Sequence, residues 1–298
     1  MNAKLENALY APLGWLFHAI ALLPLRVLYV VSDVLRWVAC DVLRYRRPLV
    51  EQNIAASFPE LTAKEQRKIV RGFYKNFTDV FIETIKLLHI SDKEMRRRMV
   101  FEGCEQIDAL VKKGIPVGVF CSHFCNWEWI TSIVLYAYVD EKVKYSQIYR
   151  PLRNKWFDRF YLSLRSRFHT DSVAKNAVLR ELITVRKAGA AFVTGFISDQ
   201  KPSHNDGLHS IRFLNQDTPF ITGSELLLRK FHAAAFYADV ERVKRGYYRI
   251  KIIHITDDVS LTEEYAVTDR YSSLLETSIR RQPEAWLWSH NRWRRPHK

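Results

Sequence analysis

The chain has 298 residues, of which 48% are hydrophobic, and this supply of core residues excludes a disordered protein. Its 46 Lys and Arg residues outnumber 32 Asp and Glu residues, which gives a net charge of +14. That charge indicates a strongly negative partner such as nucleic acid, an anionic membrane face or an acidic carrier protein. The four cysteines contain no CxxC pair, so we expect free thiols and a body in the cytosol.

Residues 11–40 are apolar for most of their length. The run is interrupted by Pro24, Arg26, Asp33 and Arg36. A charge at the centre of a spanning helix costs about 2.5–3.5 kcal/mol, so a clean span of about 20 residues is not available. We predict an apolar, helical membrane anchor that lies in or dips into the bilayer, followed by the run Arg44-Tyr45-Arg46-Arg47 among anionic headgroups. A buried helical hairpin that caps the core is the alternative.

The next segment, from residue 49 to about residue 90, has helical spacing. Phe58-Pro59 breaks it, and Thr62 with Glu65 forms a capping box that opens the following helix. A charged helix is expected around residues 94–98. Because no repeat or flexible linker follows, we divide the chain into a membrane-associating segment, residues 1–48, and one domain, residues 49–298.

Short apolar runs alternate with helical patterns from about residue 100 onward. A helix should begin near Asn154. Strands are predicted near residue 100 and at residues 115–120, 144–149, 190–197, 211–213, 233–242 and 247–254. This alternation predicts an α/β fold, with a mixed sheet flanked by helices.

The segment from Ser122 to Glu128 follows one of these strands and carries the strongest candidates for chemistry. Residues five apart on one helix are separated by about 140°, so His123 and Glu128 would not meet there. They can meet if His123 ends the strand and Glu128 opens the next helix, at the carboxyl edge of the sheet. We therefore predict His123 as a general base and Glu128 as the carboxylate that orients it, with a purely structural pair as the alternative.

Further segments give the chain a family resemblance. They are residues 149–154 (YRPLRN), 198–200 (SDQ), 213–215 (FLN), 218–220 (TPF) with Gly223, and 283–293 (PEAWLWSHNRW). With the histidine-x4-glutamate pattern, they resemble the lipid A biosynthesis lauroyl/myristoyl acyltransferases of the lysophospholipid acyltransferase superfamily. The last segment departs from the family pattern at Ala285 and Asn291. We expect these changes to be tolerated because the tryptophans and Arg292 remain.

The resemblance implies a glycerolipid acyltransferase-like fold at the cytoplasmic face of the inner membrane. It implies direct acyl transfer from an acyl-carrier-protein thioester to a hydroxyl of a lipid A precursor, without a cofactor. Arg150 and Arg153 would stabilise the oxyanion or bind acceptor phosphates, unless they form a solvated basic face. Asp199 matches the second acidic position of the family, with a catalytic, structural or acceptor-orienting role, and Gln200 shapes the same loop.

Other chemistries fit the sequence less well. Cys125 beside His123 would allow an acyl-enzyme, but it occupies an unspecified position of the motif. Ser122 lacks a G-x-S-x-G elbow. His204, Asp206 and His209 lie in a polar loop without a second ligand pair, so we expect no metal.

Two broader alternatives concern the partners. Arg292, Trp293, Arg294 and Arg295 resemble a single-strand nucleic-acid patch, but beside an apolar N-terminus we favour a membrane or carrier contact and expect no nucleic acid. The acceptor could instead be a lysophospholipid or an amino-acid-containing lipid. The alternative outside the enzymes is a noncatalytic membrane protein that binds anionic lipid.

Overall fold

The computed structural model describes residues 3–203 and 207–293. Its α-helices are α1 (Ala3–Leu22), α2 (Leu25–Trp37), α3 (Arg47–Ser57), α4 (Ala63–Lys86), α5 (Asp92–Arg98), α6 (Cys104–Val111), α7 (Lys155–Arg165), α8 (Val178–Lys187), α9 (Gly223–Lys230) and α10 (Ala266–Arg281). Shorter turns are the π-helix η1 (Val38–Val42) and the 3₁₀ segments η2 (Trp127–Leu135), η3 (Ser166–Phe168), η4 (Val259–Leu261) and η5 (Pro283–Ala285). The strands are β1 (Met99–Glu102), β2 (Val117–Cys121), β3 (Val143–Tyr149), β4 (Asp171–Ala174), β5 (Ala191–Ile197), β6 (Leu208–Phe213), β7 (Gln216–Ile221), β8 (Ala234–Lys244) and β9 (Tyr247–Thr256).

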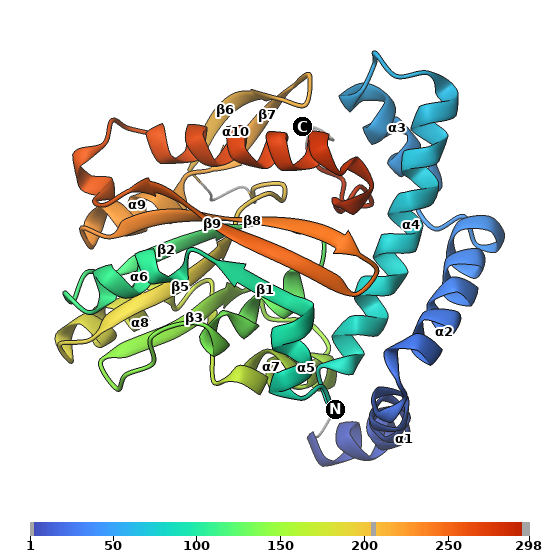
Figure 1. Ribbon diagram of the computed structural model, residues 1–298, viewed down its shortest axis with the longest axis horizontal. Helices are drawn as coiled ribbons and strands as arrows, with labels where there is room; N and C mark the ends of the chain where they lie inside the picture. The colour runs from blue at the N-terminus through green and yellow to red at the C-terminus, as the bar shows by residue number, and fades with distance from the viewer. Residues whose placement is uncertain (1–2, 204–206, 294–298) are drawn as a thin grey trace.

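Seven strands of the described part form one sheet in the order β1-β9-β8-β2-β5-β3-β4. Neighbours pair in parallel except β8 and β9, which form an antiparallel hairpin, while β6 and β7 form a separate antiparallel pair. Helices flank the sheet, as Figure 1 shows. The predicted α/β fold with a mixed sheet is therefore confirmed.

The strand β2 at the centre of the sheet is fully buried. Such burial is expected for a parallel strand covered on both faces. Gly118 on this strand faces Leu228 of α9, and a Cβ atom at position 118 would overlap the leucine side chain. Glycine therefore allows α9 to lie directly on the sheet, which fixes the strand that leads to His123.

The capping box predicted at the start of α4 is present. The Thr62 amide donates to Glu65 Oε2 at 2.8 Å, and the Glu65 amide donates to Thr62 Oγ1 at 3.4 Å. The helix expected after His123 is a 3₁₀ helix, η2, instead of an α-helix. Thr131 and Ser132 explain part of this difference, because their hydroxyls donate to carbonyls three residues earlier, at 3.2 and 2.7 Å.

The N-terminal helices lie beside α4, at the right of Figure 1. No helix within residues 3–203 and 207–293 is long and apolar enough to cross a membrane. Some apolar side chains of this region are strongly exposed (Trp15 is 74% exposed and Val30 64%), whereas others, such as Leu25 and Leu28, are buried in the core. One face of these helices therefore packs on the core and the other is exposed, and the membrane anchor stays a prediction.

Candidate active site

The carboxyl ends of three adjacent parallel strands bring the predicted residues together. His123 follows β2, Asp199 and Gln200 follow β5, and Arg150 follows β3. Parallel neighbours end at the same edge of a sheet, so segments far apart in the chain meet there. A pocket of about 610 Å³ opens at this edge, and His123, Gln200 and Arg150 line it.

His123 is held by two residues of the loop after β5. Its Nδ1 lies 2.8 Å from Asp199 Oδ1, and its backbone amide donates to Asp199 Oδ2 at 3.0 Å. Because a carboxylate only accepts hydrogen bonds, this contact assigns the proton of a neutral imidazole to Nδ1. Nε2 is then an acceptor, and it lies 3.2 Å from the side-chain amide nitrogen of Gln200.

Asp199 is itself fixed in a nearly closed environment, with its side chain only 2% exposed. The indole nitrogen of Trp286 donates to Oδ2 at 2.8 Å. Burial opposes ionisation of Asp199, but His123 and the hydrogen bonds from His123 and Trp286 outweigh it and lower the pKa of the carboxyl. Asp199 is therefore a stable anion behind the imidazole.

Glu128 lies in the first turn of η2, as predicted, but its carboxylate bonds to Arg165 and not to His123. Arg165 donates from Nη2 to Oε1 at 2.8 Å and from Nε to Oε2 at 2.9 Å. Burial alone would lower the pKa of Arg165, and the bonds to Glu128 raise it instead. The expected contact between Glu128 and His123 is thus corrected: Asp199 holds the imidazole, and Glu128 and Arg165 both line the pocket.

The turn that carries these residues, the corner (residues 122–128), has a constrained backbone. Cys125 adopts a left-handed conformation with φ of 52°. The C-terminal segment pairs with the corner: the Cys125 amide donates to Ala285 O at 2.9 Å, and the Leu287 amide donates to His123 O at 3.1 Å. The segment that includes Trp286 therefore supports the corner and orients Asp199.

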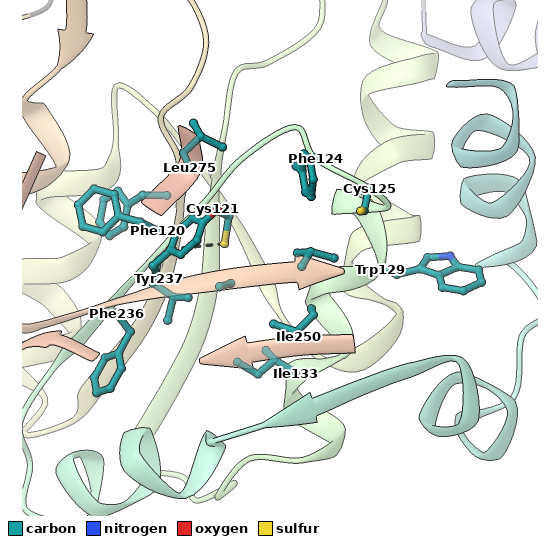
Figure 2. Close-up of a cluster of buried hydrophobic side chains, with 14 of the residues drawn as sticks. Phe120, Cys121, Phe124, Cys125, Trp129, Ile133, Phe236, Tyr237, Ile250 and Leu275 are labelled. Carbon is teal, nitrogen blue, oxygen red and sulfur yellow. Dashed lines mark hydrogen bonds between the residues drawn. The ribbon is translucent and has the colours of Figure 1, made fainter. Parts of the chain in front are cut away.

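The structure separates the other candidates. Arg150 is exposed at the pocket, whereas Arg153 is exposed and is not among the described residues that line it. Cys125 is buried among apolar side chains such as Phe124 and Trp129 (Figure 2), and burial raises the pKa of its thiol. Neither Cys125 nor Ser122 lines the pocket, so neither presents a nucleophile to it.

The polar loop and the C-terminus give further corrections. Residues 204 and 206 of the metal candidate lie outside the described residues, and His209 lies 2.9 Å from Asp269. Among residues 3–203 and 207–293, no group of three or more potential ligands could hold a metal ion. Arg292 is buried, with its guanidinium 4.9 Å from the Phe220 ring centre, so it is not part of an exposed basic patch; residues 294–298 are not described.

The pocket extends from His123 along the sheet. Its β-sheet wall includes Val119, Tyr145, Val193, Gly195 and Ile197, and η2 contributes Ile130 and Ile133. Val193 lies four residues before Ile197 on β5, so this wall spans roughly 13 Å. A long apolar group can therefore lie along the sheet with its polar end at His123.

Sequence reasoning found His123, Asp199, Gln200 and Arg150 but missed two polar partners. Arg165 ends α7, a helix whose sequence gives no separate signal for a pocket residue. Trp286 belonged to a segment that supported the resemblance, but its bond to Asp199 was not predicted. Both contacts join segments that lie far apart in the chain, which only the folded arrangement brings together.

Comparison with known proteins identifies the family. The bacterial lipid A biosynthesis acyltransferase family matches residues 7–295. The chain is similar to the lipid A biosynthesis palmitoleoyltransferase of Escherichia coli (strain K12), with 22% identity over 274 residues, 91% of this chain and 86% of that protein. It has the same identity and coverage with a lipid A biosynthesis acyltransferase of Shigella flexneri. The chain therefore belongs to the bacterial lipid A biosynthesis acyltransferase family and is an acyltransferase.

Proposed function

We propose that this enzyme transfers a fatty acyl group from an acyl-carrier-protein thioester to a hydroxyl of a lipid A precursor, at the cytoplasmic face of the inner membrane. One observation carries the proposal: His123 stands at an apolar pocket with Nδ1 bonded to Asp199 and with Nε2 as an acceptor that faces the side-chain amide of Gln200. Such an imidazole suits a general base for an alcohol. Among the described residues that line the pocket, Cys121 carries a thiol, but burial raises its pKa to about 12, which disfavours an acyl-enzyme.

The reaction requires one proton to move twice. Nε2 of His123 takes the proton of the acceptor hydroxyl as the oxygen attacks the thioester carbonyl carbon. The tetrahedral intermediate then collapses, the carbon–sulfur bond breaks, and the leaving thiolate receives the proton from Nε2. Asp199 stabilises the imidazolium between these steps, so it takes the orienting role that the sequence suggested for Glu128.

Charged residues of the pocket have separate roles in this proposal. Glu128 holds the guanidinium of Arg165 in the pocket wall, where its positive charge would stabilise the oxyanion of the intermediate. Arg150, exposed at the pocket, would bind a phosphate of the acceptor. Arg153 would contribute only to the basic surface outside the pocket. Gln200 would give way to the acceptor hydroxyl at Nε2 of His123.

Two surfaces support the proposed location and donor. Val27, Val30, Val34 and Trp37 lie on one exposed face of α2, so this helix can rest in the interface of a membrane. Lys68, Arg71 and Lys75 line a groove along α4. Together with the net charge of +14, these cations would attract an acidic carrier protein.

The proposal is tested by mass spectrometry of lipid A from cells that carry the intact gene, a deletion, or His123→Ala. We expect the deletion and His123→Ala to lack the same acyl chain, while the wild-type gene restores it. Unchanged lipid A with loss of another acylated lipid would replace the acceptor. Full acylation by a well-folded His123→Ala protein would refute the proposed base.

A further inference from the structure

A carboxylate outside the pocket lies directly behind the corner. Glu83, near the end of α4, has no exposed surface and does not line the pocket. Its Oε2 accepts hydrogen bonds from Asn126 Nδ2 at 2.6 Å and from the Tyr248 hydroxyl at 2.8 Å. Its Oε1 accepts one from the Tyr29 hydroxyl at 2.7 Å. The two carboxylate oxygens therefore accept hydrogen bonds from three parts of the chain: α2, the corner and β9.

We propose that Glu83 is a positioning residue for acyl transfer, because its buried carboxylate holds Asn126 and with it the corner between β2 and η2. The inference rests on the proposed function, in which His123 on this corner is the base. Asn126 lies between the base and Glu128. A displacement of its side chain would therefore move both ends of the corner.

The side chain of Asn126 has two tasks. Its Oδ1 accepts a hydrogen bond from the Trp129 amide at 3.1 Å and so caps η2. Its Nδ2 donates to Glu83, and the Trp129 indole nitrogen donates to the backbone oxygen of the same glutamate at 3.0 Å. The start of η2 is thereby bonded to α4 through the side chain of Asn126 and the indole ring of Trp129.

These bonds matter because the corner is strained and needs support on two sides. The left-handed Cys125 precedes Asn126, and such a conformation persists only where its surroundings impose it. The C-terminal segment supports the corner through backbone pairing at residues 123 and 125. Glu83 supports it from α4, through a side chain that no apolar residue of similar size can replace.

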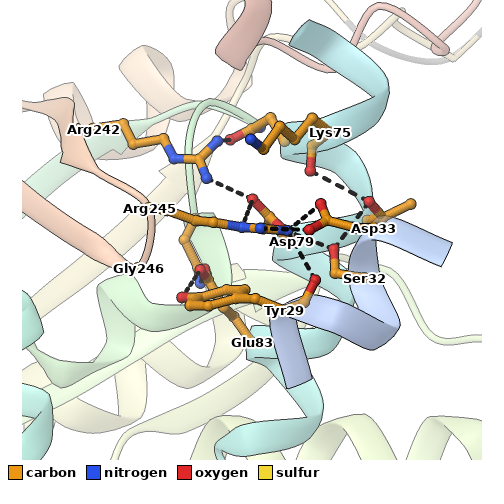
Figure 3. A network of polar contacts seen from close by, with 12 residues as sticks. Tyr29, Ser32, Asp33, Lys75, Asp79, Glu83, Arg242, Arg245 and Gly246 are labelled. Atoms are coloured by element: carbon orange, nitrogen blue, oxygen red, sulfur yellow. Dashed lines mark hydrogen bonds and ion pairs between the residues drawn. The ribbon is translucent and has the colours of Figure 1, made fainter. Parts of the chain in front are cut away.

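The support reaches further, to the N-terminal helices. Figure 3 shows Glu83 beside Tyr29, with Asp79 and Arg245 in the neighbouring ion-pair network. Arg245 bonds Asp79 and Asp33, while the Ser32 hydroxyl donates to Asp79 at 2.7 Å. The carboxylate that holds the corner therefore also belongs to the polar contacts between α2 and α4.

The test compares three single variants by steady-state kinetics on folded protein, with thermal unfolding measured for each. Asn126→Ser keeps a capping oxygen but loses the bond to Glu83, and Glu83→Leu removes the carboxylate. We expect both to lower kcat by about tenfold or more, with KM for the thioester within about twofold, because small misplacements of reacting groups are costly. The matched control, Tyr248→Phe, removes a bond to the same Oε2 from strand β9 and should keep kcat.

A double variant and a conservative variant complete the design. Glu83→Leu with Asn126→Ser should be no slower than the slower single variant, and Glu83→Gln, which can still accept from Asn126, should recover most of kcat. Normal kcat in folded Asn126→Ser, or an equal loss in Tyr248→Phe, would overturn the inference. If His123→Ala were active in the same assay, the proposed function would fail instead, which separates the two failures.

Discussion

The Oδ1 atom of Asp199 lies 2.8 Å from Nδ1 of His123, although the two residues are 76 positions apart in the chain. The second oxygen of the same carboxylate accepts from the His123 amide and from Trp286. One buried anion thus fixes the ring, the backbone of the corner and the C-terminal segment. Imidazole orientation here depends on the junction of β5 with β2, not on the spacing within the histidine-x4-glutamate motif.

The first prediction concerns this anion. Asp199→Asn should lower kcat by about 10²–10⁴-fold, because an amide no longer stabilises the imidazolium and can hold the wrong tautomer. Turnover of a purified variant with a radiolabelled thioester measures the loss. Circular dichroism confirms that the variant is folded.

Glu128→Gln provides the comparison for Asp199→Asn. It removes the charge that pairs with Arg165 but leaves the contacts of His123 intact. We expect it to lower kcat less than Asp199→Asn does. A severe loss in Glu128→Gln beside near-normal Asp199→Asn would return the orienting role to Glu128.

The second prediction concerns the length of the acyl chain. Gly195 lines the pocket, and a Cβ atom there would meet Gln147 and Ser146 at 3.8 Å, an ordinary contact. Gly195→Val therefore fits the sheet but fills the pocket. Since one methylene is worth about 1–3 kcal/mol in an apolar site, preference for a donor two carbons shorter should rise at least about tenfold. Competition between donors, followed by mass spectrometry of products, measures this ratio, and an unchanged ratio would exclude position 195 from the acyl site.

Local sequence patterns predicted the main elements because their causes are local. Strand β5 was expected at residues 190–197 and runs from Ala191 to Ile197, since a buried parallel strand needs a continuous apolar run. The cap at Thr62 was predicted for the same reason, as its partner Glu65 lies three residues away. Strand order and the antiparallel placement of β9 depend on distant packing and were not predicted.

The sequence predicted which residues form the candidate site, but not which of them bond to one another. His123 was predicted at the carboxyl edge of the sheet, and Asp199 follows the strand that was predicted at residues 190–197. Their partnership could not be inferred, since it requires β2 and β5 to be neighbours with matched ends. The Glu128 contact was predicted wrongly because the sequence spacing could not reveal Arg165, which reaches the same position from α7.

The third prediction concerns stability at low pH. Burial lowers the pKa of His290 from 6.5 to about 4, and its Nε2 accepts a hydrogen bond from the Lys201 amide at 3.0 Å. Between these two pH values the unfolded chain binds the proton and the folded chain does not, so the free energy of unfolding falls as pH falls. His290→Gln should reduce this fall between pH 7.5 and 4.5 by about 1–3 kcal/mol, a value discounted for partial exposure. Urea unfolding at both pH values checks it, and equal falls in both proteins would contradict it.

The fourth prediction concerns the donor. If Lys68 and Arg71 attract an acidic carrier protein, raising salt from 0.05 to 0.3 M should raise KM for the carrier thioester severalfold, because exposed charges are screened beyond about 10 Å at 0.1 M. KM for the same acyl group on pantetheine, which lacks the protein, should change little. Lys68→Glu with Arg71→Glu should reproduce the effect of salt. Salt-independent use of the carrier would exclude this groove as its binding surface.

The fifth prediction concerns the membrane. Val30 and Val34 lie one turn apart on the exposed face of α2, and no helix of the described residues can span a bilayer. Each carries an apolar side chain into the proposed interface, so Val30→Glu with Val34→Glu should reduce binding to anionic vesicles at least about tenfold. Vesicle flotation measures the bound fraction. Val139→Glu, at a 63% exposed valine outside the N-terminal helices, is the matched control and should bind as the wild type does. Equal loss in the control would mean that added negative charge, and not the apolar face of α2, governs binding.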